Sequence, residues 1–369
     1  MSDTPPSDLP SLLLPPDSDS DSDEETWGLT LNGSRLRPAP LGGDHPLAKL
    51  KIVSLNFDGV FCEKPLTKGG ANKRLTLFRW LLDEVKADIV LATETHITGD
   101  LRLQARVARE WAKGGGGKVI CTPSLSSSSR GTAIFIRSGC DITIDTDSIY
   151  VPVGSGSREA PLKNRVTLAQ MDWHGHRFSV GSVYAPVIES ERPRFFKALK
   201  QVLSDYTVRG PDGLPIQPTT LLPCILGGDW NTTPNPLLDK SHDRTSTGLL
   251  GCVQLSALCR SLELVDLWRD RYPEVREYTK HSITRGYGQI STRLDRMYMH
   301  GSTLGMAQRV RHVPCPLSDH SAVVAELAVS SVSTARDGWI HNDSHLDSPA
   351  YCEHSKHVRI LIRHLDLGE

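Results

Sequence analysis

The sequence predicts an α/β sandwich with mixed β-sheets, in which parallel and antiparallel strands occur together. Short apolar runs of strand length alternate with segments whose apolar residues recur at helical spacing, as in βα units. Other strand-like runs follow one another closely, as in β-hairpins. Hydrophobic residues make up 38% of the 369 residues and charged residues 23%, which is typical of a globular protein with a substantial core.

The elements follow from their patterns in chain order. A strand at 50–56 comes first, and a helix follows near 75–85, where Leu75, Phe78 and Leu82 share one face. We expect further strands at 88–93, 118–122, 131–137, 165–172 and 177–184, and helices near 100–113 and 190–204. The second half adds a strand at 221–226 that ends in a Gly227-Gly228-Asp229 turn, a helix near 252–261, and strands near 291–299 and 321–328.

The two ends of the chain lack this patterning. Residues 1–45 carry nine acidic and two basic side chains, whereas the rest of the chain has a net charge of +6. We interpret residues 1–46 as a disordered acidic tail, because they bury too little apolar surface to offset the entropy of ordering. A phosphorylated or partner-binding tail is the alternative. The domain itself is expected to span 47–330, and the polar, histidine-rich residues 331–369 are expected to be a solvated tail rather than a metal site.

Composition also restricts location and partners. None of the eight cysteines forms a Cys-x-x-Cys pair, which argues against a zinc ribbon and favours reduced thiols in an intracellular protein. The chain shows no basic secretory leader and no apolar run near the ~20 residues of a membrane span, so we expect no membrane partner. The mildly basic body is compatible with a polyanionic substrate.

Polar clusters stand at the ends of the apolar runs. They are Asn56-Phe57-Asp58-Gly59, Glu94-Thr95-His96, Tyr184-Ala185-Pro186, Gly228-Asp229-Trp230-Asn231, Arg293-Leu294-Asp295-Arg296 and Ser318-Asp319-His320. Carboxylates and amides at strand ends are the groups that metal-dependent cleavage of a phosphodiester needs, because a divalent cation can neutralise both the phosphate and the leaving group.

The residue types suggest roles within such a site. Glu94 is the best metal ligand, with Asp58 and Asp319 as supplementary ligands, because Mg²⁺ prefers oxygen ligands and keeps several waters. Asp229 would activate the attacking water. Asn231 lies two residues on, on the same side if the segment is extended, and would fix a phosphate oxygen or the water.

His320 would donate to the phosphate if a carboxylate held its other ring nitrogen, and Asp295 could supply that carboxylate. Each cluster also has a structural interpretation: a turn at Asn56 to Gly59, a loop at Asp229, a surface ion pair at Asp295, and a packed Tyr184 with a satisfied hydroxyl. Their order, and their positions at strand ends, favour catalysis.

The ordered set resembles the endonuclease/exonuclease/phosphatase superfamily over residues 48–328. The resemblance implies a DNase-like four-layer α/β sandwich, with two packed mixed sheets flanked by helices, and Mg²⁺-dependent phosphoesterase chemistry, with Mn²⁺ as a substitute. It also implies that Asn56 bonds near Glu94 and that Tyr184 holds the phosphate. The first-strand motif resembles that of apurinic/apyrimidinic endonucleases.

Within the superfamily, the sequence is most similar to the endonuclease domain of LINE-type (non-LTR) retrotransposons. Leu226-Gly-Gly-Asp-Trp-Asn231 and Glu277-Tyr278-Thr279 carry this similarity, and Thr279 would contact phosphate. Residues 338–351 resemble the segment that joins such endonucleases to reverse transcriptase. No reverse transcriptase motif follows, which suggests a free-standing module. Two positions depart from the pattern, since Val187 replaces an asparagine and Lys280 replaces an aromatic residue.

The sequence therefore predicts a monomeric, retrotransposon-derived DNA endonuclease that nicks by direct water attack and leaves a 3′-hydroxyl and a 5′-phosphate. A repair endonuclease acting at abasic sites is the nearest alternative, and a catalytically silent nucleic-acid-binding relic is the alternative of another class. DNA is the expected partner, with no obligate protein partner. Nuclear access is expected, although the sequence has no clear basic import signal. Residues 280–290 are expected to form a hairpin that enters a DNA groove, with a plain surface hairpin as the alternative.

Overall fold

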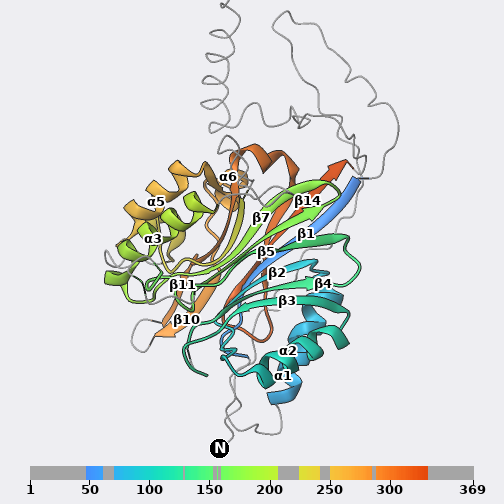
Figure 1. The fold of residues 1–369 in the computed structure, drawn as a ribbon. Coiled ribbons are helices and arrows are strands. Elements are labelled where there is room, and N and C mark those ends of the chain that lie inside the picture. The colour runs from blue at the N-terminus through green and yellow to red at the C-terminus, as the bar shows by residue number, and fades with distance from the viewer. Residues whose placement is uncertain are drawn as a thin grey trace, which may run out of the picture. The chain divides into compact units, whose positions relative to one another are not determined.

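Two six-stranded β-sheets face each other and carry helices on their outer faces (Figure 1). The computed structural model describes residues 47–60, 70–127, 129–152, 156, 159–206, 224–241, 250–284 and 288–330. Both predicted tails lie outside these residues. The arrangement confirms the predicted four-layer α/β sandwich with mixed sheets.

The first sheet has the strand order β13-β14-β1-β2-β4-β3. Its strands are β1 (Leu47–Asn56), β2 (Ile89–Thr93), β3 (Gly116–Thr122), β4 (Thr132–Arg137), β13 (Ala307–Pro314) and β14 (Ser321–Ser330). Only β1 and β2 are parallel neighbours in this sheet. The helices α1 (Gly70–Arg79) and α2 (Leu101–Lys113) and the π-helical turn η1 (Trp80–Glu84) belong to the layer outside it.

The second sheet has the order β5-β6-β7-β8-β12-β9. Its strands are β5 (Ile142–Tyr150), β6 (Val166–Trp173), β7 (His176–Tyr184), β8 (Cys224–Asp229), β9 (Leu264–Asp266) and β12 (Asp295–His300). Here β7 and β8 are the parallel pair. The helices α3 (Arg192–Asp205) and α5 (Cys252–Ser261) pack outside it. Short elements complete the fold: η2 (Glu189–Glu191), α4 (Pro236–Asp239), α6 (Leu267–Arg271) and η3 (Gly301–Met306).

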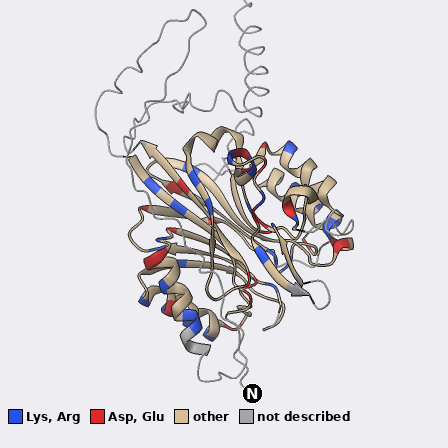
Figure 2. Cartoon of the chain, turned by 180° about the vertical axis from the view of Figure 1, so that it is seen from behind, with Lys and Arg blue, Asp and Glu red and all other residues tan. Residues whose placement is uncertain are grey.

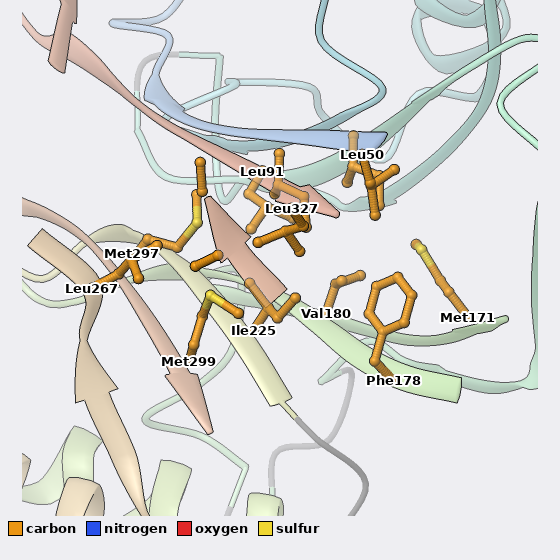
Figure 3. Packing of buried hydrophobic residues seen from close by; sticks show 14 of the residues in the cluster. Leu50, Leu91, Met171, Phe178, Val180, Ile225, Leu267, Met297, Met299 and Leu327 are labelled. Atoms are coloured by element: carbon orange, nitrogen blue, oxygen red, sulfur yellow. The ribbon is translucent and has the colours of Figure 1, made fainter. Parts of the chain in front are cut away.

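Alternation along the strands builds three cores. In β1, Leu50 and Ile52 point between the sheets, whereas Val53 and Leu55 point to the helical layer, because successive strand side chains alternate in direction. The inter-sheet cluster fills the space between the two sheets (Figure 3). Each large apolar side chain buried there stabilises the fold by about 1.5–3 kcal/mol.

Helix α2 shows how the outer layers attach. Leu103, Val107 and Trp111 lie on one face and are buried, as the helical period requires. The Trp111 indole N–H donates to the Ile136 carbonyl at 3.0 Å, which ties the helix to β4. Lys and Arg occur together with Asp and Glu on the helical layers (Figure 2), as expected for solvated outer faces.

One predicted turn is wrong. Gly227, Gly228 and Asp229 continue β8 instead of ending it. The glycines serve close packing: a Cβ on Gly228, whose φ is +157°, would lie 1.8 Å from the Val183 carbonyl oxygen in β7. The strand therefore carries Asp229 in register with Tyr184, its partner in β7.

The hairpin predicted at 280–290 forms a separate two-stranded sheet of β10 (Lys280–Thr284) and β11 (Gly288–Thr292), and its tip lies outside the described residues. The six cysteines in the described residues are free thiols. Within the described part of the chain, no helix is long and apolar enough to cross a membrane.

Candidate active site

Strand ends from both sheets meet at one edge of the sandwich. The carboxyl ends of β1 and β2 lie together because these strands are parallel, and β14 starts beside them because it runs antiparallel to β1. In the second sheet, Asp229 at the end of β8 pairs with Tyr184 of β7 and with Asp295 of β12. The polar clusters of the sequence are thereby collected in one place.

Asn56 connects the two sheets at this edge. Its side-chain nitrogen donates to Glu94 Oε1 and to Asp229 Oδ2, each at 3.1 Å, and its side chain is almost completely buried. The Asn56 carbonyl oxygen Oδ1 accepts the backbone N–H of Asp58 at 2.9 Å. One amide therefore fixes the relative position of two carboxylates that belong to different sheets.

Glu94 is held ionised by its neighbours. Burial by itself would raise its pKa, but the surrounding groups, chiefly His96 and then the hydrogen bonds of Tyr184 and Asn56, lower the pKa to about 2. The His96 ring nitrogen Nε2 is 3.7 Å from the carboxylate, slightly beyond hydrogen-bond distance. An ionised carboxylate at this point is suited to hold a cation.

Asp58 and Asp319 bring further negative charge to Glu94. Burial raises the pKa of Asp58 most, followed by the charges of Asp319 and Glu94. Asp58 is exposed, and the Asp319 side chain keeps 46% of its exposure. These oxygens repel one another and remain open to solvent, which is the donor set that fits a hard divalent cation such as Mg²⁺ or Mn²⁺.

Asp229, Asp295 and His320 form a second, buried group. Their ligand atoms lie within 4.8 Å of one another, a spacing that could itself hold a metal. Here, however, the atoms bond to protein groups: His320 Nδ1 lies 2.7 Å from Asp295 Oδ2, and Asp229 Oδ1 accepts the backbone N–H of Asn231 at 3.0 Å. The open carboxylates around Glu94 have oxygens better suited to a cation than those of this buried group.

The charge of Asp295 raises the pKa of both of its neighbours in this buried group, Asp229 and His320. Burial and then the negative charge of Asp295 raise the pKa of Asp229. Burial alone would lower the pKa of His320, but the Asp295 carboxylate outweighs it and raises that pKa. The result is a carboxylate that binds a proton more readily than usual beside an imidazole that releases one less readily.

Tyr184 and Asn231 complete the predicted set. The Tyr184 hydroxyl bonds to Glu94, and burial followed by the charge of Glu94 raises its pKa well above the ordinary value, so it stays protonated. The prediction of an extended segment at Asn231 is wrong. Its φ is +47°, and its side-chain nitrogen donates to the Ala185 carbonyl at 2.9 Å, which joins the β7 and β8 ends.

Thr279 does not occupy the position expected of a phosphate contact. It is fully buried, and its hydroxyl oxygen accepts the backbone N–H groups of Leu294 and Asp295 at 3.1 and 3.0 Å. Thr279 therefore positions the backbone of Asp295. The Tyr-Thr motif pointed to the right neighbourhood, but burial could not be inferred from it.

Four of the ten non-glycine residues with positive φ in the described part of the chain belong to this site. Asp58, Glu94, His96 and Asn231 all have positive φ, between +47° and +55°, which is uncommon for residues other than glycine. Such conformations persist where the surrounding structure enforces them, and they cluster at functional sites.

Three supporting residues were missed from the sequence. The Ser318 hydroxyl donates to the Asn56 backbone oxygen at 2.8 Å and accepts the backbone N–H of His320 at 3.1 Å. The Arg165 guanidinium lies 5.3 Å from the centre of the Tyr184 ring. His96, although part of a noted cluster, was given no role; it is buried and its ring nitrogens have no hydrogen-bond partner in the structure. A serine two residues before a site histidine was the one signal available.

Solved structures of similar fold include apurinic/apyrimidinic (AP) endonucleases. The AP endonuclease LMAP from Leishmania major matches with a TM-score of 0.58 and 16% identity, over 76% of this chain and 88% of that one. An AP endonuclease from Archaeoglobus fulgidus matches with a TM-score of 0.55 and 19% identity, over 77% of this chain and all of that one. The chain thus has the DNase-like fold of these enzymes.

In sequence, the chain is related to the transposon TX1 uncharacterized 149 kDa protein of Xenopus laevis, with 26% identity over 215 residues. The match covers 58% of this chain and spans 15% of the transposon protein. No family profile matches the chain. The fold and this relative agree with the resemblance to the superfamily and to its retrotransposon members.

Proposed function

We propose that the chain is a divalent-metal-dependent DNA endonuclease of retrotransposon origin that nicks a phosphodiester by direct attack of water. The observation that supports this most strongly is the Asn56 bridge, which places the ionised Glu94 next to the buried Asp229. A metal-binding carboxylate beside a candidate base is the minimum that hydrolysis of a phosphodiester requires.

Glu94, Asp58 and Asp319 would hold the Mg²⁺ or Mn²⁺ ion, with Asn56 positioning Glu94. The ion supplies positive charge to the phosphate and to the departing oxygen. Oxygen ligands, solvent exposure and mutual repulsion of the carboxylates all support this assignment.

Asp229 would take the proton of the attacking water. Its two oxygens are oriented by Asn56 and by the backbone of Asn231. Its raised pKa makes it a stronger base than an exposed aspartate while leaving it ionised near neutral pH.

His320 and Tyr184 would donate to the phosphate oxygens. Asp295 accepts the Nδ1–H of His320, so Nε2 is the nitrogen left for the substrate. The Asn231 amide would complete the site by holding the β7 and β8 ends together. The water oxygen bonds to phosphorus, the bond from phosphorus to the 3′ oxygen breaks, Asp229 takes the water proton, and the 3′ oxygen takes a proton from solvent. The products are a 3′-hydroxyl and a 5′-phosphate.

The test is nicking of supercoiled plasmid by purified protein with Mg²⁺, with and without EDTA. We expect open-circle DNA that EDTA prevents and that Asp229→Ala and Glu94→Ala reduce by at least 10²-fold. Asp83→Ala, which removes an exposed carboxylate on η1, is the matched control and should nick like the wild type. Wild-type rates in both site variants would refute the assignment.

A repair endonuclease for abasic sites is the second candidate, favoured by the AP endonucleases among the structural neighbours. A duplex with one abasic site separates the two: preferential cleavage at the lesion identifies the repair enzyme. Chelator-insensitive DNA binding without cleavage of either substrate would instead identify a silent nucleic-acid-binding module. Both candidate enzymes act on DNA. We further propose that the protein enters the nucleus and acts as a monomer.

A further inference from the structure

Lys280, the first residue of β10, is attached to the end of the candidate site. It forms an isolated β-bridge with His320, and the neighbouring His281 N–H donates to the Asp319 carbonyl at 3.3 Å. On the other side, the Ser321 N–H donates to the Thr279 carbonyl at 2.6 Å. These backbone bonds fix the start of the hairpin against the segment that carries Asp319 and His320.

The Lys280 ammonium lies between two groups with proposed roles. Its Nζ is 3.0 Å from His320 Nε2 and 3.4 Å from Asp319 Oδ2. The side chain keeps 32% of its exposure, whereas that of His320 keeps 1%. The ammonium therefore stands at the opening to solvent, on the side of the imidazole that faces away from Asp295.

The space beside the Lys280 ammonium and His320 Nε2 suits a phosphate group of the substrate. Nδ1 of His320 is committed to Asp295, so Nε2 and the Lys280 ammonium are neighbouring nitrogens directed to the same space. In the DNA-free protein the Lys280 ammonium, which can only donate, bonds to Nε2 at 3.0 Å. A phosphate placed between the two nitrogens would accept from the ammonium through one oxygen and from Nε2–H through another. The partly exposed cation at this position favours the anionic DNA backbone over an apolar sugar or base.

We propose that Lys280 is a second phosphate-contacting cation of the site, which binds the DNA backbone together with His320 and is held by Asp319 when no DNA is bound. The proposal rests on the proposed function, because it takes Asp319 as a metal ligand and DNA as the substrate. It adds a residue that contacts the phosphodiester backbone and not the bases.

Because of its two contacts, loss of the Lys280 ammonium should have opposite effects on DNA affinity and on divalent-cation affinity. Removing the ammonium takes one positive charge away from the phosphate, so DNA binding weakens. The same change removes a cation that competes for Asp319, so a divalent cation should bind more tightly. A variant that merely damaged the fold would weaken both kinds of binding.

The experiment compares Lys280→Met, Lys280→Arg and the control Lys118→Met, which removes an exposed lysine from the edge strand β3. Binding of a fluorescent duplex is measured by anisotropy in EDTA over a range of salt concentrations. We expect Lys280→Met to weaken binding on the order of ten-fold. The slope of log affinity against log salt should become shallower by about 0.9, the value for one phosphate contact. Lys280→Arg should retain the slope.

Mn²⁺ binding to the DNA-free protein is then measured by electron paramagnetic resonance. Lys280→Met should bind Mn²⁺ about two- to five-fold more tightly, the effect of removing one partly exposed ion-pair partner. If Lys280→Met left DNA affinity and the salt slope unchanged, or bound Mn²⁺ more weakly than the wild type, the inference about Lys280 would be overturned. The proposed function would still stand as long as the wild-type protein nicks plasmid. A wild-type protein that binds neither Mn²⁺ nor DNA would overturn the proposed function itself.

Discussion

A single short hydrogen bond between Asp295 and His320 determines what each ring nitrogen can do. Asp295 is fully buried and receives Nδ1–H at 2.7 Å, while its backbone N–H is held by Thr279. The imidazole therefore cannot rotate without leaving a buried carboxylate unpaired, which is unfavourable. At the residue scale, a conservative substitution of Asp295 should therefore affect His320 most directly.

Asp295→Asn should reduce the nicking rate by roughly 10²- to 10⁴-fold, the contribution typical of a positioned acid or base. Asparagine has the same shape but no negative charge, so His320 loses the electrostatic support that raises its pKa and that favours the Nδ1–H tautomer. Single-turnover nicking measures the loss, and DNA binding in EDTA should change far less. A wild-type rate would show that His320 is held by other groups.

At the scale of elements, a buried ion cluster fixes the segment that follows Asp229. The Asp239 carboxylate, at the end of α4, lies 2.8 Å from Arg269 and from Arg293 and 3.4 Å from Arg296. Arg293 also binds Asp266 at 2.9 Å. The cluster connects α4, α6 and the start of β12, so the position of Asp295 depends on it.

Asp239 should make stability depend on acid pH. Although burial raises its pKa, Arg296 and Arg293 outweigh this and lower the pKa to about 2, from 3.8 when unfolded. A lowered pKa stabilises the folded state fully above the unfolded value, and this stabilisation, about 2 kcal/mol, is lost as pH falls from about 5 to about 2. Urea unfolding of wild type and Asp239→Asn should show a difference that shrinks over this range.

Asp141→Asn, at an exposed aspartate, is the control and should leave the pH profile of the wild type unchanged. At neutral pH, Asp239→Asn should lower the free energy of unfolding by roughly 3–5 kcal/mol, because it leaves buried guanidinium groups without a partner. Equal stability of both proteins at neutral pH would contradict the role given to this cluster.

The sequence predicted the elements that carry a clear period and missed those that do not. Helix α5 was predicted with its observed bounds, because its apolar residues repeat at helical spacing. Strand β5 was not predicted, because it is a half-exposed edge strand without clean alternation. At β8 the glycine pair indicated a turn, but packing against β7 made glycine necessary inside a strand.

The site was predictable in its residue types and not in its contacts. Carboxylates at strand ends could be found because their local sequence marks them. The Asn56 bridge between sheets and the Lys280 contact with His320 join residues 173 and 40 positions apart, and nothing local specifies such pairs. Burial of Thr279 was likewise set by its tertiary surroundings.

At the scale of the whole molecule, the geometry of the candidate site depends on how the two sheets pack. Glu94 and Asp229 come from opposite sheets, and the cluster that includes Leu50, Leu91 and Ile225 sets the distance between those sheets (Figure 3). Precise placement of the site is therefore a property of the entire sandwich and not of any one loop.

Leu91→Ala should lower the free energy of unfolding by about 2–5 kcal/mol, since it leaves a cavity between the sheets. Leu101→Ala removes the same atoms from a side chain that is 77% exposed and should change stability by less than about 0.5 kcal/mol. Urea unfolding measures both. A small effect at Leu91 would mean that the inter-sheet contact can collapse around the gap.

The pairing of β1 with β14, in which Leu47 lies opposite Ser330, determines when a growing chain can complete the fold of the domain. The first strand of the domain must wait for the last one, and contacts so distant along the chain form slowly. During synthesis, residues emerge from the ribosome in order, and domains fold once their sequence is complete. His320 immediately precedes β14, so an unfinished polypeptide contains Glu94 and Asp229 but neither the closing strand nor its histidine. The candidate site therefore cannot be completed before β14 has been synthesised.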